Sequence, residues 1–578
     1  MSEYDLVVRA GTVVDGSGGD PFLADVAVIG GRIAEVGNVR GSGAREIDAE
    51  GAVVTPGFVD IHTHYDGQAV WDNTLQPSSW HGVTTAVGGN CGVGFAPVKE
   101  EDRDQLIELM EGVEDIPGTA LHDGLRWGWG SFGEYLDVLS ERPRDLDFAT
   151  QVPHAALRIF AMGERAVALE PATGDEIAQM ARLAAEAVRA GALGFTTSRT
   201  LAHKTKAGEV TPVYGSADAE LVGISRAVGA TGTGVLQLIT DFPDVAGEFT
   251  LMREMVRASG RPLSVSLLQI RETPERYREI LAEITAANQA GLAIRAQVGV
   301  RGMGLLLGLP CTLHPFSTNA VWKSLGHLPV AEQAARMAEP GMRAAILAAQ
   351  TDEKDLRIPG AIRTDRYEAM HELQAFPDYE PLPGTSVLAR AQREGRTPED
   401  VAYDILIKDD GRGLIYQPFS NYAHGNLDAV REMLTHEYTL PGLGDGGAHV
   451  GSICDSSFPS TLLQHWVRER PRERLSLPFV VRRQARDTAR AVGLHDRGEV
   501  RPGFKADLNV IDIDKMRVHR PVIVYDLPGG GRRLLQRADG YRHTIVSGVE
   551  TYQDGEPTGA LPGRVIRGPQ SAPARRAS

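Results

Sequence analysis

The sequence predicts an α/β protein in which a (β/α)8, TIM-like barrel is joined to a small β-sandwich formed by the two ends of the chain. Three observations favour this fold. In the middle of the chain, short apolar runs such as GVLQLIT and PLSVSLLQI alternate with amphipathic stretches such as GDEIAQMARLAAEAVRAG, as parallel βαβ units do. These units are numerous enough to close a barrel. Near both ends, the pattern changes to short strands with tight turns.

The β-sandwich is predicted from residues 1–55 and 485–562. In the N-terminal segment, DVAVIGGRIAEVG indicates a hairpin whose two-residue turn is Gly30 and Gly31. Strands of similar length and turn chemistry return near the C-terminus, as GEVRPGFKADLNVIDID and RHTIVSGVETYQDGEP. Neither layer is large enough to be stable alone, so we expect the two ends to pair into one unit.

The barrel is predicted over residues 56–484, with a lid-like helical insertion at about 338–415. Inside that insertion, Thr397 as the N-cap and Pro398 at the first helical position mark a helix start. The last segment, 563–578, is expected to be a flexible tail, because it contains mostly small, polar and basic side chains.

Composition excludes several partners. The 578 residues carry a formal net charge of −16, which argues against nucleic acid or an anionic membrane as a partner, because binding there depends on a basic face. The first residues lack the pattern of a signal peptide, and no apolar run is long enough to span a bilayer. The three cysteines suggest no disulfide framework, so a cytoplasmic location is expected.

Two histidines open the candidate site. His62 and His64 lie in GFVDIHTHYDG, directly after a short apolar run. Residues two apart on a strand face the same side, and the end of a barrel strand is where such folds carry their chemistry. Neutral imidazoles suit zinc. The alternative, two surface or turn histidines, stays open at this point.

A carboxylate late in the chain is the second candidate. Asp445 follows a short apolar run in LPGLGDGGAHVG. Such a side chain could bind a metal and accept a proton from a metal-activated water. On its own, however, an Asp-Gly pair more often forms a turn.

Together these motifs resemble the amidohydrolase superfamily, and most closely its N-acyl-D-amino-acid deacylase (D-aminoacylase) branch. The resemblance extends from Tyr4 to about Pro562, and the motifs occur in family order: DIHTHYDG, GVTTAVGGNCGVGFAP, GALGFTTS, GDGGAHVG and GLHDRGEVRPGFKADLNVID. It implies a zinc-bearing barrel with a β-sandwich built from both termini. It also implies hydrolysis of an amide-type bond other than a peptide bond.

The resemblance assigns roles to individual residues. His62 and His64 match the ligands after the first strand, and Cys91 in GGNCG matches a zinc-binding cysteine. Asp445 matches the aspartate after the last strand, which is both a metal ligand and the general base and acid. A metal-activated water would then attack the amide carbonyl while Asp445 takes the proton and returns it to the leaving group.

The sequence departs from the deacylase pattern at two mid-barrel strand ends. Deacylases carry a histidine at each of these ends, whereas Gln237 and Gln269 lie near the matching places here. Neutral amides are poor zinc ligands beside imidazole or thiolate. We therefore expect one zinc ion, although another divalent metal would also suit the ligands.

The sequence also departs from the deacylase pattern at the residue that binds the substrate. Deacylases carry an arginine after the last-strand aspartate, which holds the substrate carboxylate. Here Arg468 comes late and is expected to face elsewhere, so the substrate either lacks that carboxylate or uses another arginine. Further candidates for substrate binding are Arg199, His203, His449, Gln237, Gln269 and Asn90.

The leading hypothesis is a metal-dependent hydrolase of a small-molecule amide, of the N-acyl-D-amino-acid deacylase kind, acting without nucleic acid or membrane and as a homo-oligomer. One alternative is a cyclic amidohydrolase of the hydantoinase or dihydroorotase kind. Those enzymes usually need a carbamylated lysine, and no lysine occurs at the mid-barrel strand ends. The other alternative is a degenerate, non-catalytic scaffold member of the superfamily.

Overall fold

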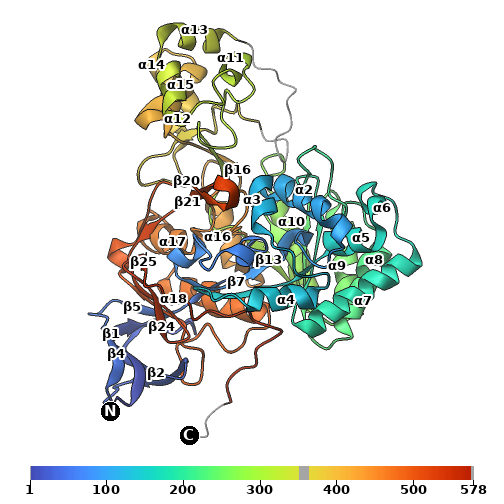
Figure 1. The fold of residues 1–578 in the computed structure, drawn as a ribbon. Helices are drawn as coiled ribbons and strands as arrows, with labels where there is room; N and C mark the ends of the chain where they lie inside the picture. Colours follow the sequence, from blue (N-terminus) through green and yellow to red (C-terminus); the bar gives the residue numbers. More distant parts are fainter. Residues whose placement is uncertain (1, 350–362, 575–578) are drawn as a thin grey trace.

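The computed structural model describes residues 2–349 and 363–574, and its centre is a parallel β-barrel (Figure 1). In chain order the barrel strands are β6 (Phe58–Asp60), β7 (Val83–Gly88), β8 (Asp147–Thr150), β10 (Gly194–Arg199), β11 (Val235–Thr240), β12 (Leu263–Leu267), β13 (Ile294–Val298) and β17 (Thr439–Pro441). All pairings among them are parallel, and the short β9 (Val152–Pro153) joins β8 to the sheet of β10. The predicted fold class is confirmed.

The barrel closes where the first and last strands end. The backbone N–H of Asp445 donates to the carbonyl of His62 at 3.0 Å, and the N–H of His64 donates to the carbonyl of Gly446 at 2.7 Å. These two bonds bring the segment after β6 against the segment after β17. The candidate metal residues near both ends of the barrel sequence therefore meet at this seam.

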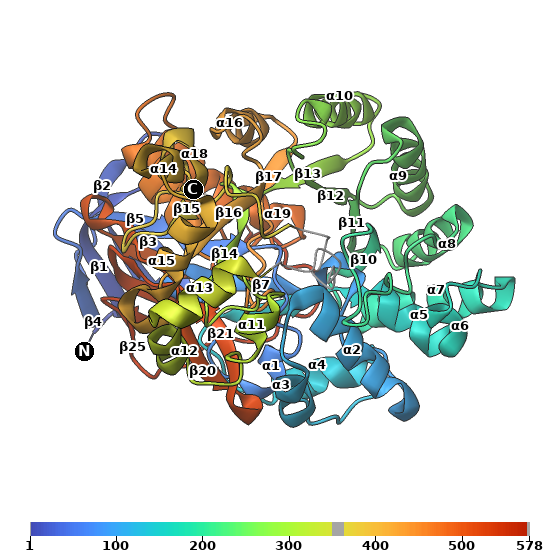
Figure 2. The ribbon, with the colours of Figure 1, turned by 90° about the horizontal axis from the view of Figure 1, so that it is seen from above.

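Helices cover the outside of the strands, as Figure 2 shows from above for α7 (Gly174–Ala190), α8 (Asp218–Gly229), α9 (Val245–Ser259), α10 (Arg276–Gln289) and α16 (Asp428–Thr435). The longest of these, α7, shows how sequence sets an element. Thr173 caps its start by accepting from the N–H of Glu176, and Gly191 follows its end. Met180, Ala184 and other residues on one face are buried, so the helix packs through a single apolar stripe.

Both chain ends contribute to one nine-stranded sheet beside the barrel. Its strands are β1 (Tyr4–Val13), β2 (Phe22–Ile29), β3 (Arg32–Gly37), β4 (Gly43–Asp48), β5 (Val53–Pro56), β18 (Leu508–Ile511), β23 (Tyr541–Val546), β24 (Val549–Gln553) and β25 (Glu556–Pro557). Antiparallel pairing of β5 with β18 joins the two ends, with Val54 opposite Val510. The β2–β3 turn has positive φ at Gly30 and Gly31, as a two-residue hairpin requires.

The insertion lies between β13 and α16 and forms a lobe above the barrel (Figure 1). It contains β14 (Met303–Leu307), α11 (Ala320–Lys323), α12 (Val330–Met337), α13 (Pro340–Ala348), β15 (His371–Glu372), α14 (Val387–Glu394), α15 (Pro398–Gly411) and β16 (Ile415–Ser420). Its helices pack on a hydrophobic core of their own. The predicted cap of α15 is confirmed, because Thr397 accepts from the N–H of Asp400.

The insertion begins earlier than the predicted 338–415. The apolar run of β14 resembles a barrel strand in sequence, but it pairs antiparallel with β16 instead of joining the barrel. Periodicity alone does not distinguish these two environments. Residues 350–362 of the predicted insertion lie outside the described residues.

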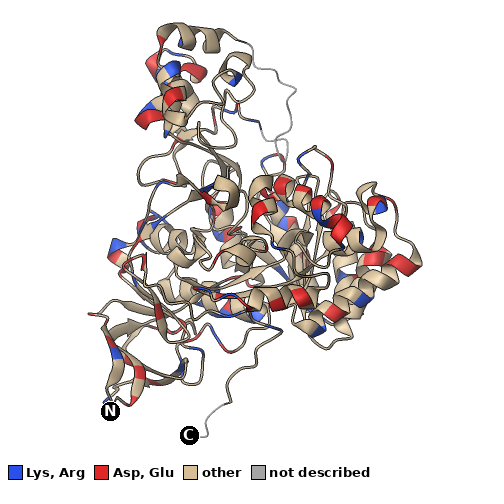
Figure 3. Cartoon of the chain, viewed as in Figure 1, with Lys and Arg blue, Asp and Glu red and all other residues tan. Residues whose placement is uncertain are grey.

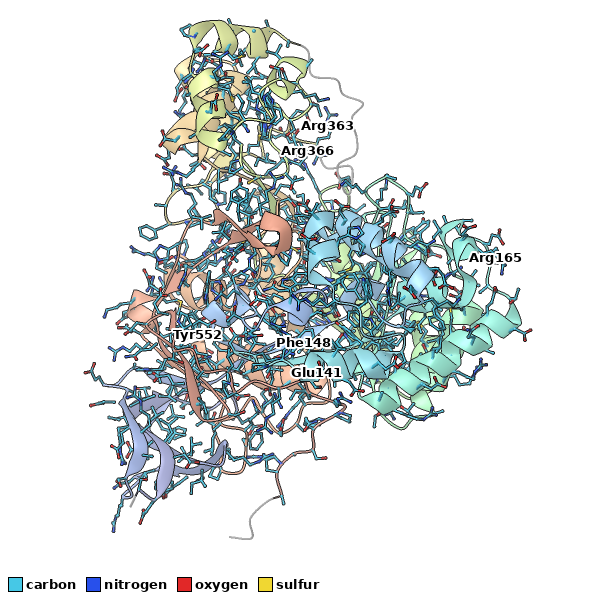
Figure 4. The ribbon with its side chains drawn as sticks, viewed as in Figure 1. Glu141, Phe148, Arg165, Arg363, Arg366 and Tyr552 are labelled. Atoms are coloured by element: carbon cyan, nitrogen blue, oxygen red, sulfur yellow. The ribbon has the colours of Figure 1, made fainter. Side chains whose placement is uncertain are left out.

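The predicted flexible tail needs correction over residues 563–570. Gly563 donates to the carbonyl of Arg144, and Ile566 donates to the carbonyl of Phe148, which is labelled in Figure 4. Gln570 pairs with Leu494. Composition predicted a free end, but the backbone groups of this segment pair with the barrel. Residues 575–578 lie outside the described residues.

Charged residues of both signs are spread over the outer helices and the lobe (Figure 3). Within the described part of the chain, no helix combines the length and hydrophobicity that crossing a bilayer requires.

Glu380 connects the insertion to the barrel, and its charge is expected to make stability depend on pH. Despite burial, hydrogen bonds from His465 and Arg470 lower the pKa of Glu380 to about 2. Its stabilising contribution is therefore complete above the ordinary pKa of 4.5 and is lost as the pH falls towards 2. We expect Glu380→Gln to cost about 2–3 kcal/mol at pH 7.

The measurement is the midpoint of thermal unfolding of wild type and Glu380→Gln between pH 7 and pH 3. The difference between the two midpoints should stay constant down to about pH 5 and narrow as the pH falls below 4.5. Glu339→Gln is the control, since Glu339 is paired with Arg336 at the surface. A gap that stays constant across this pH range would contradict the prediction.

Candidate metal centre

The two histidines lie just past the end of β6, at the C-terminal mouth of the barrel. The side chains of His62 and His64 are 1% and 2% exposed, and their ring centroids lie 5.5 Å apart. The backbone bonds across the β6–β17 seam hold this segment in place. Two buried imidazoles in this arrangement can bind one metal ion together.

Cys91 comes from the turn that follows β7. Its Sγ lies 3.2 Å from Nε2 of His62, and its backbone has φ of +55°. The N–H of Cys91 donates to Oε1 of Gln237 at 3.1 Å, which fixes the orientation of the turn. A side chain at Gly89 would place its Cβ 2.1 Å from the carbonyl oxygen of Gln151, so only glycine fits there.

Asp445 completes the cluster from the segment after β17. Its Oδ1 lies 3.4 Å from Nε2 of His62 and 3.7 Å from Nε2 of His64. Burial opposes its charge, but a hydrogen bond to His64 and the positive field of the histidines hold the pKa of Asp445 below its usual range. The carboxylate is therefore ionised and available as a ligand or a base.

These four side chains suit a divalent metal. One ligand atom each from His62, His64 and Cys91 lies within 4.8 Å of the others, and the Asp445 carboxylate faces both imidazoles. Two imidazole nitrogens, a thiol and a carboxylate are a donor set typical of zinc. The residues present thus fit the group that the motifs imply.

Two partners behind the histidines were missed by sequence reasoning. Oε1 of Gln297, on β13, lies 2.7 Å from Nδ1 of His62. Because an amide oxygen only accepts, Nδ1 carries the proton and Nε2 keeps its lone pair for a metal. Oε1 of Glu114, at the end of α2 (Arg103–Glu114), lies 3.2 Å from Nδ1 of His64. Partners of this kind orient metal-binding histidines.

Metal binding at this centre is expected to strengthen as the pH rises. Burial raises the pKa of the Cys91 thiol to about 11, and Glu114 and Asp445 outweigh burial to raise the pKa of His64 well above its ordinary value. Both groups are thus protonated at neutral pH, and a metal must displace a proton from each. The affinity should rise about tenfold per pH unit for each proton released.

The test is a competition titration of metal-free protein against a chelator at pH 6.5, 7.5 and 8.5. Cys91→Ser should bind metal more weakly. An affinity that does not change with pH would show that these two groups are not ligands.

The structure places two of the predicted substrate residues at the cluster. His203 and His449 line the same cavity as the four metal candidates. Nδ1 of His203 lies 3.0 Å from Oγ of Ser198, and burial lowers the pKa of His203 to about 3, so its ring is neutral. Nε2 of His449 lies 3.7 Å from Oε2 of Glu114.

The remaining candidates lie outside the lining of this cavity, and the expectation that they contact substrate is corrected. Arg199 is held by Glu248 in a bidentate pair, and Gln269 accepts from the N–H of Ala423. Asn90 donates to the carbonyls of Thr63 and Val87. Gln237 positions Cys91 rather than substrate. Arg199, Gln269 and Asn90 are engaged by other parts of the protein, which motif spacing alone does not reveal.

Comparison with known proteins places the chain in a family. The model of the "Amidohydrolase family" matches residues 45–552. The chain belongs to the amidohydrolase family. As an amidohydrolase it is a hydrolase that acts on carbon–nitrogen bonds other than peptide bonds.

Three relatives show how far the likeness extends. This amidohydrolase is 26% identical to N-acyl-D-glutamate deacylase of Alcaligenes xylosoxydans xylosoxydans, over 98% of this chain and 97% of that protein. It is 35% identical to the D-aminoacylase of the same organism, over 34% of this chain and 37% of the relative. An uncharacterized protein of Mycobacterium tuberculosis is 26% identical over 96% of this chain and 92% of its own length.

Solved structures agree with this placement. A D-aminoacylase structure covers 98% of this amidohydrolase and 100% of its own chain, with 25% identity and a TM-score of 0.65. N-acyl-D-glutamate deacylase from Bordetella bronchiseptica, solved with zinc and a phosphonate inhibitor, covers 98% and 99% at 23% identity, with a TM-score of 0.63. The resemblance to the D-aminoacylase branch is confirmed.

Proposed function

We propose that this amidohydrolase uses one divalent metal ion, zinc by donor type, to hydrolyse a small N-acylated amine. The observation that carries the proposal is the convergence of His62, His64, Cys91 and Asp445 at the closing seam of the barrel. The ends of β11 and β12 contribute Ile239, Ser266 and Leu268 to the cavity and no imidazole. This favours one ion over two.

The residues divide the chemistry among them. When bound, the ion supplies a Lewis acid that polarises the amide carbonyl and acidifies water. His62, His64 and Cys91 hold it, and Gln297 and Glu114 keep the two imidazoles oriented. Asp445 accepts the proton of the attacking water and returns it to the departing amine nitrogen. His203 and His449 line the same cavity and are candidates to donate a hydrogen bond to the developing oxyanion.

The two alternatives have less support. A cyclic amidohydrolase with a carbamylated lysine would need a lysine at the centre, and among the described residues none lines the cavity. A non-catalytic scaffold has no need of four buried ligand side chains, nor of Gln297 and Glu114 behind them. Burying such polar groups costs free energy, and binding of a metal ion would offset that cost.

The deciding experiment combines metal analysis with a hydrolysis screen. Purified protein should contain one zinc ion per chain, and the zinc-loaded enzyme should release amine from simple N-acyl amines or N-acyl-D-amino acids. Two ions per active chain would overturn the one-metal part of the proposal. A fully loaded protein that hydrolyses none of these amides would overturn the proposed reaction.

A further inference from the structure

The walls of the cavity that contains the metal candidates are mainly apolar. The cavity holds about 180 Å³, and its apolar lining includes Val113, Leu268, Met303, Leu305, Leu313 and Phe419. The insertion supplies part of this wall from β14 and β16. Groups next to the scissile amide therefore face hydrocarbon, which favours apolar substituents.

Three carboxylates lie in the wall of the cavity. Glu114, Asp115 and Asp445 line it, whereas no arginine or lysine does so among the described residues. A divalent ion would be balanced by the Cys91 thiolate and the Asp445 carboxylate. Glu114 lies 3.2 Å from Nδ1 of His64 and 3.7 Å from Nε2 of His449, and Asp115 accepts from the hydroxyl of Thr312. A substrate carboxylate would meet these two carboxylates in a partly desolvated space, where like charges repel.

The two arginines that the sequence offered for carboxylate binding have partners elsewhere. Arg199 pairs with Glu248, and Arg468 donates to the carbonyl of Ile513. Lys204, Lys206 and Arg532 line a separate cavity of about 780 Å³, which shares only the Asp115 and Thr312 wall with the metal cavity. Among the described residues, therefore, no arginine or lysine lines the metal cavity, where the amine part of the substrate must lie.

We infer that the enzyme selects amides whose amine part is uncharged and apolar near the nitrogen, and discriminates against N-acyl amino acids. This inference rests on the proposed function, because it names the substrate class of the same site. In place of the bidentate arginine clamp that favours carboxylate binding, the cavity has an apolar wall and the carboxylates of Glu114 and Asp115.

The experiment compares N-acetylphenethylamine with N-acetyl-D-phenylalanine, which differ by one carboxylate. The zinc-loaded enzyme should show at least tenfold higher kcat/KM for the uncharged amide. In parallel, calorimetry measures binding of the matched ketone isosteres, in which CH2 replaces the amide N–H. The uncharged ketone should also bind at least tenfold tighter.

The two readouts separate the claims. If neither amide is hydrolysed but the uncharged ketone binds tighter, the proposed reaction fails and the selectivity holds. If both amides are hydrolysed and the carboxylated ligand binds equally well or better, the selectivity is overturned and the reaction stands. Equal binding of both ketones overturns the selectivity regardless of turnover.

Two variants make the cause testable. Asp115→Asn removes one wall charge and keeps a residue that tolerates the φ of +50° found there, so the preference should shrink several-fold. Leu313→Arg adds a cation and should raise the affinity for the carboxylated ketone. Asp137→Asn is the matched control, since Asp137 pairs with Arg567 at the surface and should leave the ratio unchanged. A preference that neither wall variant alters would refute the electrostatic explanation.

Discussion

Replacing His62 with alanine is expected to abolish both metal retention and amide hydrolysis. Nε2 of His62 lies within 3.2 Å of the Cys91 sulfur and 3.4 Å of the Asp445 carboxylate, so it occupies the middle of the ligand cluster. Without it, the remaining donors leave a gap on one side of the site. Water would fill the position, and the coordination that polarises the carbonyl would be lost.

Metal analysis and kcat/KM on the same preparations test this expectation. His62→Ala should contain far less than one ion per chain and show only background hydrolysis. His424→Ala is the control, because His424 pairs with Glu275 at the surface. Full activity in a metal-depleted His62→Ala protein would refute the assignment of the site.

Replacing Asp445 with asparagine is expected to lower kcat by about 10²–10⁴-fold, the usual contribution of a positioned proton-transfer group. His62, His64 and Cys91 still provide three ligand atoms, so a substantial share of the metal should remain bound. Asparagine also tolerates the φ of +47° at this position, which keeps the backbone intact. The loss therefore reports proton transfer rather than misfolding.

A pH profile distinguishes this role from simple ligation. The pKa of Asp445 lies below its usual range, so the wild-type enzyme keeps its base ionised throughout the neutral range. Metal-loaded Asp445→Asn should stay slow at every pH, and raising the metal concentration should not restore it. Recovery of wild-type kcat with excess zinc would show that Asp445 acts only as a ligand.

The parts of the site that sequence could predict are those encoded by short local motifs. His62 and His64 are two residues apart in the segment that directly follows β6, and Cys91 and Asp445 lie in glycine-rich turns. The barrel alternation placed all four at strand ends. These features depend on local chemistry, and the fold preserves them.

The supporting residues depend on tertiary closure and were not predictable. Glu114 ends a helix far from His64 in sequence, and Gln297 resembles any polar strand residue. The prediction that Arg199 and Gln269 contact the substrate failed for the same reason. Their partners, Glu248 and Ala423, come close to them only in the folded chain. The start of the insertion was not predicted because a short apolar run looks the same in sequence whether it forms a barrel strand or a strand of an antiparallel pair.

The seam between β6 and β17 also has a consequence for how the enzyme acquires its metal. Three donors come early in the chain and Asp445 comes late, and the backbone bonds that align them form only when the last strand docks. During synthesis, a nascent chain would expose His62, His64 and Cys91 long before residue 445 leaves the ribosome. All four donors can therefore bind the metal together only after the barrel has closed. Tight metal binding is then a sign that folding is complete.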